Sequence, residues 1–327
     1  MRKSSSSTKD EESNEQLLQF FQLRGKHPLE LARKLVLEEA SKLDSVQVKE
    51  ALKYFILDYW QDLARPTLLS VCCKAVGGDP KVTIPFAVSL SILSGGIDIH
   101  DDIIDRSKRK HGRSTVYGKY GKEIALLTAD ALLFKGFTLL NEASAKIPKT
   151  KAQKILKTIE HLFYELGDAE ALELKLRGRW GITPEEYLHI VRKKAADVEA
   201  HAQIGAILGN ATAKEEKNLA NYGRLLGMSI IIRDDILDSL DIKELKHRIV
   251  KEHIPLPLVY ALGNGKSVHY SAPPNILFKE FSGEKIEAGI KKCNNLLREL
   301  INEACVYIKN LNGYGNLKLI LEACTEL

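Results

Sequence analysis

Residues 88–105 read Val-Ser-Leu-Ser-Ile-Leu-Ser-Gly-Gly-Ile-Asp-Ile-His-Asp-Asp-Ile-Ile-Asp, an apolar run that ends in aspartates. Asp98, Asp101, Asp102 and Asp105 fall at spacings i, i+3, i+4 and i+7, which places four carboxylates on one face of a helix. The apolar residues around them indicate that this face borders the interior, where carboxylates that repel one another need a cation. All-oxygen ligands favour Mg²⁺ or Mn²⁺ over zinc. We therefore expect Asp101, Asp102 and Asp105 to bind metal.

The pattern recurs in residues 229–241, Ser-Ile-Ile-Ile-Arg-Asp-Asp-Ile-Leu-Asp-Ser-Leu-Asp, again after an apolar run. A single Asp-Asp-x-x-Asp motif on a helix is usually a solvated face. Two copies, each at the end of an apolar helix, predict a shared metal site with Asp234, Asp235 and Asp238 as the second set of ligands. Metals between two such faces would clamp a diphosphate and stabilise the charge that develops as it leaves.

The rest of the chain is typical of a large helical protein. From Gln16 onward the apolar residues recur with a period close to 3.6, and strand-like alternation is nearly absent. We therefore expect an all-α fold with a single domain over residues 16–327, preceded by a disordered tail over residues 1–15 that is neither a signal peptide nor an anchor. No apolar run approaches the roughly 20 residues that span a bilayer.

The bulk composition does not favour a nucleic-acid-binding protein or a zinc protein. Hydrophobic residues make up 44% of the chain and the net charge is only +5, which is typical of a soluble globular protein and does not suggest nucleic acid. The five cysteines are odd in number and none has zinc-site spacing. Reduced thiols in a cytoplasmic protein are therefore expected.

The chain resembles the trans-isoprenyl diphosphate synthases, also called polyprenyl synthetases, from about Leu29 to the C-terminus. The strongest stretches are residues 100–115, 185–194, 227–238 and 257–262. The resemblance implies roughly a dozen helices packed round a deep central cavity, usually in a homodimer. It also implies a transferase of prenyl groups that uses Mg²⁺, with Mn²⁺ as a substitute. Metals draw the diphosphate off an allylic substrate, and the alkene of isopentenyl diphosphate attacks the allylic cation.

The resemblance implies two groups of substrate contacts besides the metal ligands. Lys110 and Lys194 would contact the allylic diphosphate, whereas Arg65 and His111 would contact isopentenyl diphosphate. The second group departs from the family pattern Gly-Gly-Lys-x-x-Arg-Pro, because residues 60–66 read Trp-Gln-Asp-Leu-Ala-Arg-Pro and Asp62 reverses the charge of the lysine. Ser94 and His111 are further departures on this side, whereas Ala195 and Ile231 depart from the family near the allylic cation. Each lost charge-assisted contact is worth about 1.5–3 kcal/mol.

Gly95 and Gly96 bear on product length. The fifth residue before the first cluster lines the floor of the family's cavity, where a bulky aromatic side chain stops chain growth early. Glycine at this position implies an open floor and a product of C20 or longer. The alternative is that the two glycines allow close helix packing.

Three interpretations of function stay open at this point. The first is a chain-elongating synthase with a divergent acceptor site. The second is an enzyme that ionises an allylic diphosphate and directs the cation to another acceptor or to cyclisation. The third is a non-catalytic subunit of a heteromeric synthase, against which the intact aspartates argue.

Overall fold

The computed structural model describes residues 5–110, 112–263 and 283–325. Apart from one pair of two-residue strands, its regular elements are helices, which confirms the all-α prediction. The chain forms two compact units. Unit 1 comprises residues 1–74 and 78–153, and unit 2 comprises residues 75–77 and 154–327. The assignment of residues 16–327 to a single domain stays a prediction.

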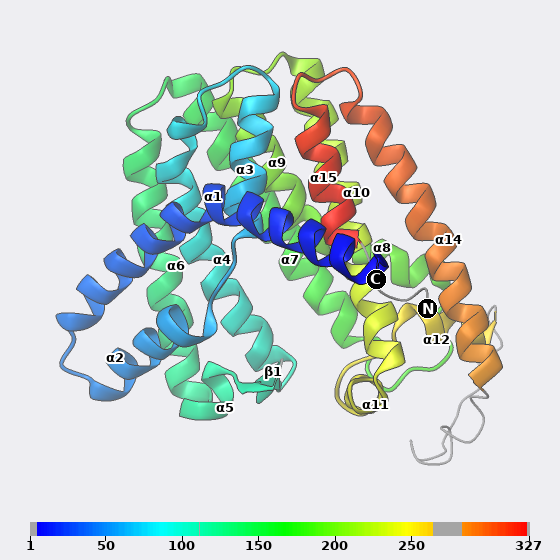
Figure 1. Ribbon diagram of the computed structural model, residues 1–327. Coiled ribbons are helices and arrows are strands. Elements are labelled where there is room, and N and C mark those ends of the chain that lie inside the picture. Colours follow the sequence, from blue (N-terminus) through cyan, green and yellow to red (C-terminus); the bar gives the residue numbers. More distant parts are fainter. Residues whose placement is uncertain (1–4, 111, 264–282, 326–327) are drawn as a thin grey trace. The chain divides into compact units, whose positions relative to one another are not determined.

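Unit 1 is built around α4, the helix that carries the first aspartate cluster (Figure 1). Its elements in chain order are α1 (Ser5–Ser41), α2 (Val46–Lys53), a π-helical stretch (Tyr54–Tyr59), α3 (Ala64–Ala75), a 3-10 turn (Pro80–Thr83), α4 (Ile84–Ile104), β1 (Arg109–Lys110), β2 (Arg113–Ser114), α5 (Val116–Tyr120) and α6 (Lys122–Ser144), followed by the start of α7 (Lys149–Leu174). The two strands pair antiparallel, with Lys110 opposite Arg113.

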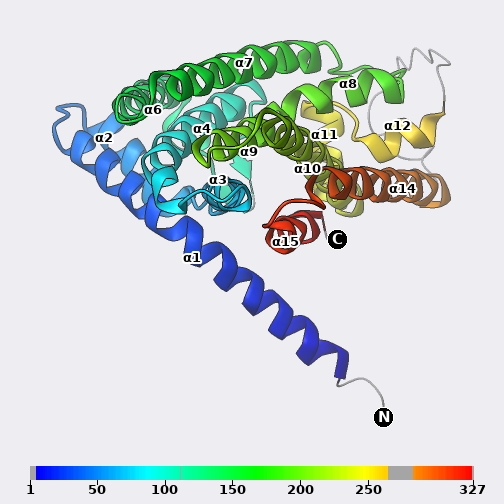
Figure 2. The same ribbon diagram turned by 90° about the horizontal axis from the view of Figure 1, so that it is seen from above.

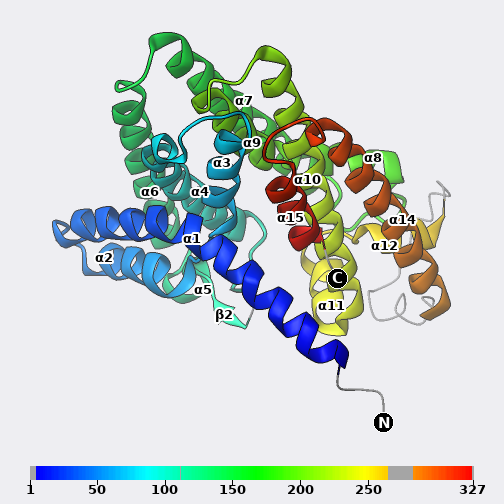
Figure 3. The ribbon, with the colours of Figure 1, turned by 45° about the horizontal axis from the view of Figure 1, so that its top comes forward.

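The long helix α1 has its C-terminal part against α2 and α4, and its N-terminal turns extend beyond the other helices of unit 1 (Figures 2 and 3). The helix begins at Ser5, inside the segment for which we expect a disordered tail. The expected disorder of residues 1–15 stays a prediction.

The apolar run before the first aspartate cluster forms the buried part of α4. Every residue from Phe86 to Gly96 is buried, and α6 lies alongside. The segment Pro80–Ile104 is long and apolar enough by composition to cross a membrane. This finding corrects the expectation that no apolar run approaches the length needed to span a bilayer. However, 72% of its most apolar window is buried inside the protein, as expected for a core helix.

Glycines let α4 and its neighbours approach closely. A Cβ atom on Gly96 would lie 2.9 Å from Cγ of Leu133 and 3.0 Å from the carbonyl oxygen of Ala129, both on α6. A Cβ atom on Gly95 would lie 2.8 Å from the ring of Phe55. Both glycines therefore serve close packing within unit 1. Their expected role as the floor that sets chain length stays a prediction.

Unit 2 is organised around α10, which carries the second aspartate cluster. It contains the rest of α7 and then α8 (Pro184–Lys194), α9 (Ala196–Leu208), α10 (Ala213–Leu240), α11 (Ile242–Lys251), α12 (Leu256–Leu262), α14 (Gly283–Ile308) and α15 (Tyr314–Thr325). Helices α9 and α14 pack along α10, and α8, α11, α12 and α15 also contact it (Figure 3). Thr183 and Thr212 begin α8 and α10 with capping boxes, which fixes where each helix starts.

The packing of Gly96 leads to a stability prediction. The substitution Gly96→Ala should lower the free energy of unfolding by about 1–3 kcal/mol, because the new methyl group overpacks the contact between α4 and α6. Gly167→Ala is the matched control, since a Cβ atom there meets nothing within 4 Å. It should leave stability unchanged or raise it by up to about 1 kcal/mol. Denaturant unfolding followed by circular dichroism measures both, and equal stabilities of Gly96→Ala and wild type would contradict the packing argument.

Candidate active site

The first aspartate cluster holds a lysine of its own chain. Lys110 lies on β1, and its Nζ is 3.0 Å from Oδ2 of Asp101 and 2.9 Å from Oδ1 of Asp102. The short hairpin of β1 and β2 folds the basic segment after α4 back toward the aspartates. Asp102 is only 2% exposed, so Lys110 neutralises a carboxylate that is almost fully buried. Contact of Lys110 with an allylic diphosphate stays a prediction.

Burial and charge shift the ionisation of this pair. Burial raises the pKa of Asp102 to about 6, against the lowering effect of Lys110, and the neighbouring Asp101 and Asp105 add to the rise. Burial alone would lower the pKa of Lys110, but Asp101 and Asp102 outweigh it and hold the pKa above its ordinary value. The lysine is therefore a permanent cation at neutral pH, while its buried partner is an easily protonated carboxylate.

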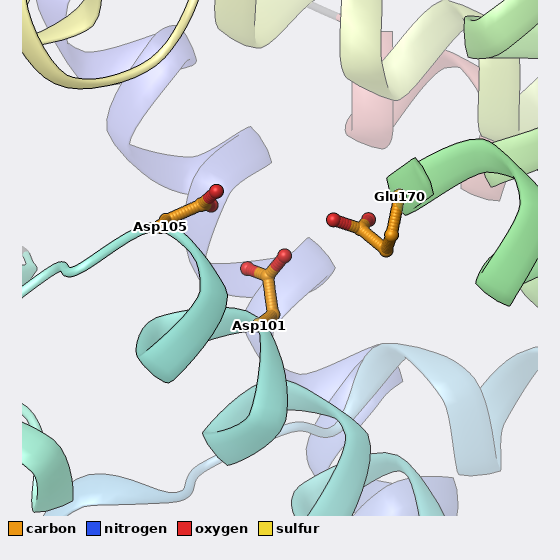
Figure 4. Close-up of side chains that lie close together, drawn as sticks. All are labelled: Asp101, Asp105 and Glu170. Atoms are coloured by element: carbon orange, nitrogen blue, oxygen red, sulfur yellow. The ribbon is translucent and has the colours of Figure 1, made fainter. Parts of the chain in front are cut away.

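Asp101 and Asp105 project from the last turns of α4 and are less buried than Asp102 (Figure 4). Asp105 follows the last residue of the helix, and each of the two aspartates offers a carboxylate oxygen that lies within 4.8 Å of the other. One hydrated divalent cation can bind two oxygens at such a separation. The donors are all oxygens, as Mg²⁺ prefers, so these two residues fit the expected metal. Whether they bind it stays a prediction.

A pocket of about 620 Å³ lies in unit 1 beside the first cluster. Its lining combines two aromatic side chains with acidic and basic ones: Tyr59, Trp60, Gln61, Asp62, Asp98, Asp102, Lys110 and Arg113. Asp98 shares this pocket with the cation of Lys110. The pocket is therefore lined by residues just before Arg65, which is itself not among the lining residues, and its carboxylates would oppose an anion.

Asp62 engages the arginine that would bind isopentenyl diphosphate. Its Oδ2 is 2.9 Å from Nη1 of Arg65. Its Oδ1 accepts hydrogen bonds from the backbone N–H groups of Ala64 at 2.8 Å and Arg65 at 3.3 Å, as a helix cap does. Asp62 thus both caps the start of α3 and holds the guanidinium of Arg65 in place. Ser94 is buried in α4, and His111 lies outside the described residues.

The second cluster shows the same division into a buried and an exposed aspartate. Asp235 is 1% exposed, whereas the side chain of Asp234 is 56% exposed and pairs with Arg233 at 3.3 Å. Oδ2 of Asp235 accepts the hydroxyl of Tyr187 at 2.6 Å and the backbone N–H of Leu256 at 3.2 Å. Burial raises the pKa of Asp235, and these donors act in the opposite direction.

Arg248 provides the cation of the second cluster. It lies on α11, whose first turn is capped by the side chain of Asp241. Its Nη2 donates to Oδ1 of Asp235 at 3.0 Å and its Nη1 to Oδ2 of Asp238 at 2.8 Å. Its Nε lies 2.9 Å from Oε2 of Glu252. Although burial alone would lower the pKa of Arg248, Asp235 leads a group of anions that raises it.

A chain of polar contacts connects Asp235 with Lys194 inside unit 2. Nε2 of His253 lies 3.2 Å from the hydroxyl of Tyr187, and its Nδ1 lies 3.1 Å from Oε1 of Glu173. Burial lowers the pKa of His253 to about 3, despite the opposing effect of Glu173, so the ring is neutral at neutral pH. Glu173 in turn forms an ion pair with Lys194.

Lys194 is also 3.0 Å from Glu170, which Figure 4 labels on α7. This lysine ends α8 with its ammonium between two glutamates. Its expected contact with an allylic diphosphate stays a prediction. Since the two glutamates already neutralise it, an incoming diphosphate would have to share Lys194 with them.

Sequence reasoning missed Arg248 and the role of Tyr187. Tyr187 lies in one of the stretches that carry the family resemblance, which was a signal that the reasoning did not use. Arg248 gave a weaker signal, because α11 is rich in cations and sequence alone does not tell which of them turns inward. The spacing of the aspartates likewise does not tell which carboxylate of each pair is buried.

Comparisons with known proteins agree with the fold. The family model for polyprenyl synthetase matches residues 48–285. A geranylgeranyl diphosphate synthase of Methanosarcina mazei is 30% identical over 196 residues, which are 60% of this chain and 60% of that protein. An octaprenyl diphosphate synthase of Escherichia coli is 27% identical over 226 residues, 67% of this chain and 68% of that protein. The match thus spans about three fifths of the Methanosarcina protein.

Among solved structures, a geranylgeranyl pyrophosphate synthetase from Pyrococcus horikoshii superposes with a TM-score of 0.75 at 26% identity, over 96% of this chain and 99% of that chain. A geranylgeranyl pyrophosphate synthetase from Geoglobus acetivorans gives a TM-score of 0.75 at 22% identity, over 93% and 99%. These likenesses confirm the fold that the resemblance implied. Because the family model covers more than half of the chain, this protein belongs to the polyprenyl synthetase family.

Proposed function

We propose that this protein is a prenyltransferase that ionises an allylic diphosphate and condenses the allylic group with isopentenyl diphosphate. The product is a longer trans-prenyl diphosphate. Membership of the polyprenyl synthetase family supports the reaction class, and the names of the relatives support the substrates. The observation that carries the proposal is the pair of aspartate clusters, each at the end of a buried helix and each with two aspartates in ion pairs with one cation of the chain.

The aspartates divide into two roles in this proposal. Asp101, Asp105 and Asp234 hold Mg²⁺, with Mn²⁺ as a substitute; Asp101 and Asp105 are half-buried and Asp234 is exposed. When bound, the ion supplies positive charge to the departing diphosphate. Asp102, Asp235 and Asp238 take part through the cations that they fix, as well as through their charge. Lys110 and Lys194 bind oxygens of the allylic diphosphate.

Several finer statements belong to the same proposal. Product length is C20 or more, because neither Gly95 nor Gly96 carries a bulky side chain of the kind that shortens the product, although Phe55 and Leu133 pack against these glycines. The relatives named geranylgeranyl and octaprenyl diphosphate synthases support this range. The protein acts as a homodimer in the cytoplasm. The four cysteines whose side chains the structure describes are free, and three of them are buried, which supports that compartment.

Isopentenyl diphosphate is the acceptor in the proposal, and Arg65 and His111 bind its diphosphate. The ion pair of Arg65 with Asp62 predicts that this binding is weak, because part of the guanidinium's charge is already neutralised. The acceptor site is therefore expected to bind isopentenyl diphosphate more weakly than the family pattern would. The metal side keeps the family's full set of aspartates.

Incubation of the purified protein with Mg²⁺, allylic diphosphates from C5 to C20 and labelled isopentenyl diphosphate tests the reaction. Labelled prenyl diphosphates longer than the starter are expected. Release of diphosphate without label in the product would instead support another acceptor or cyclisation. Activity that appears only after a second protein is added would support the role of a non-catalytic subunit.

Asp101→Asn should lower kcat/KM for the allylic substrate by about 10²–10⁴-fold, because losing a metal ligand removes several kcal/mol of charge stabilisation. Asp241→Asn is the matched control. It changes the same chemical group at the end of the second cluster's helix, but Asn still caps α11. Its kcat/KM should stay within about twofold of wild type, a difference of less than about 0.5 kcal/mol. Comparable losses in the two variants would contradict the assignment of Asp101.

Asp62→Asn should lower KM for isopentenyl diphosphate, because Asn still caps α3 but no longer neutralises Arg65. Asp62→Lys should lower it further, by about tenfold or more, since a charge-assisted contact is worth about 1.5–3 kcal/mol. Steady-state kinetics with a saturating allylic substrate measures both. An unchanged KM in both variants would show that Arg65 does not contact the acceptor.

A further inference from the structure

The buried aspartate of the second cluster already has three of its roughly four lone-pair sites in use. Oδ1 of Asp235 accepts from Arg248, and Oδ2 accepts from Tyr187 and from the backbone of Leu256. A metal ligand must direct a lone pair at the ion. A divalent ion could bind Asp235 only at the remaining lone pair of Oδ1, beside the guanidinium of Arg248, or by displacing one of these donors, two of which belong to side chains that are themselves buried or nearly so.

Arg248 lies between carboxylates on every side that the structure describes for it. Its three nitrogens approach Asp235, Asp238 and Glu252 at 3.0, 2.8 and 2.9 Å. The side chain is only 16% exposed. Unlike a metal ion, an arginine does not dissociate and stays charged at any pH that the fold survives. It therefore occupies the space and supplies the charge that a cation would otherwise supply to Asp235 and Asp238.

We propose that Arg248 is the built-in counter-ion of the second aspartate cluster and takes the place of a divalent metal between Asp235 and Asp238. The inference deepens the proposed function and rests on it, because it assigns the metal-binding capacity of the same site. Asp234, on the exposed side of α10, is then the second cluster's ligand. A divalent ion drawn toward Asp235 would meet the positive charge of Arg248 at close range, which disfavours its binding.

The position of Arg248 follows from the local sequence. Asp241 ends α10 and caps α11, so the chain turns directly from one helix into the next. Arg248 comes two turns into α11, and Glu252 at i+4 steadies the guanidinium from the far side. Tyr187 and Leu256 hold Asp235 from two further elements, α8 and α12. Four segments of unit 2 thus converge on the pair.

Manganese binding tests the proposal without relying on turnover. The full-length protein is titrated with Mn²⁺, with and without inorganic diphosphate, and electron paramagnetic resonance of the free ion counts the ions bound. Wild type and Asp235→Asn should bind the same number of ions. Arg248→Gln should bind one more per chain, because Asp235 and Asp238 lose their cation. Lys243→Gln, an equal change of charge on the exposed face of α11, should match wild type.

Thermal unfolding provides a second readout. Arg248→Gln should melt at a lower temperature than wild type without metal, since it leaves a buried carboxylate without its counter-ion. Added Mn²⁺ should raise its Tm by more than it raises that of wild type or Lys243→Gln, as linkage requires for an added ion that binds the folded state.

Two results would overturn the proposal. One is a lower number of bound ions in Asp235→Asn, which would make Asp235 a direct ligand even if Arg248→Gln failed to fold. The other is a folded Arg248→Gln variant that gains no ion and shows the same Mn²⁺-dependent rise in Tm as wild type. If wild type failed to bind Mn²⁺ in the presence of diphosphate, the result would contradict the proposed function. It would leave the role of Arg248 to be decided separately, because Arg248→Gln is also compared with wild type in the absence of diphosphate.

Discussion

A buried carboxylate must find a cation or give up its charge, and this constraint organises each of the two aspartate clusters. In unit 1 the constraint acts on Asp102, which Lys110 neutralises from the hairpin after α4. In unit 2 it acts on Asp235, which Arg248 neutralises from the helix after α10. In each case the segment that follows the cluster folds back to deliver the cation. The ion pairs thus fix the chain just past each cluster and leave other aspartates of the motif on the more exposed side.

This division explains why a motif of three aspartates does not amount to three equivalent ligands. A carboxylate that is buried and already bonded to an arginine gains little from a metal, because the arginine neutralises it and repels the incoming ion. Burial constrains the other proposed ligands less, because Asp101 and Asp105 are only half-buried and Asp234 is exposed. On the acceptor side the same logic weakens binding, since Asp62 holds Arg65 in an ion pair and at the same time begins α3. The chain therefore keeps all the aspartates of both clusters, whereas the arginine expected to bind the acceptor is held in an ion pair.

The helical fold and the position of the clusters were predictable from sequence, because an apolar period of 3.6 and aspartates at i, i+3, i+4 and i+7 depend on local geometry alone. The partners of the aspartates were not. Arg248 is ten residues beyond Asp238, and Tyr187 is 48 residues before Asp235, so their contacts depend on how α8, α10 and α11 pack. The glycines show the same limit. From the sequence, Gly96 could either open the floor of a cavity or allow close helix packing. The close packing becomes visible only in the structure, where Leu133 lies against Gly96.

The most direct test of the account is a crystal structure with Mn²⁺ and a non-reactive thio analogue of an allylic diphosphate, with the ions located by their anomalous scattering. The account predicts manganese peaks bound to Asp101 and Asp105 and at Asp234, with the ion pairs of Lys110 to Asp102 and of Arg248 to Asp235 retained. A peak bound directly by Asp102 or Asp235, with its lysine or arginine displaced, would contradict the division of roles between the buried and the exposed aspartates. The absence of any peak at Asp101 and Asp105 would contradict the metal site itself.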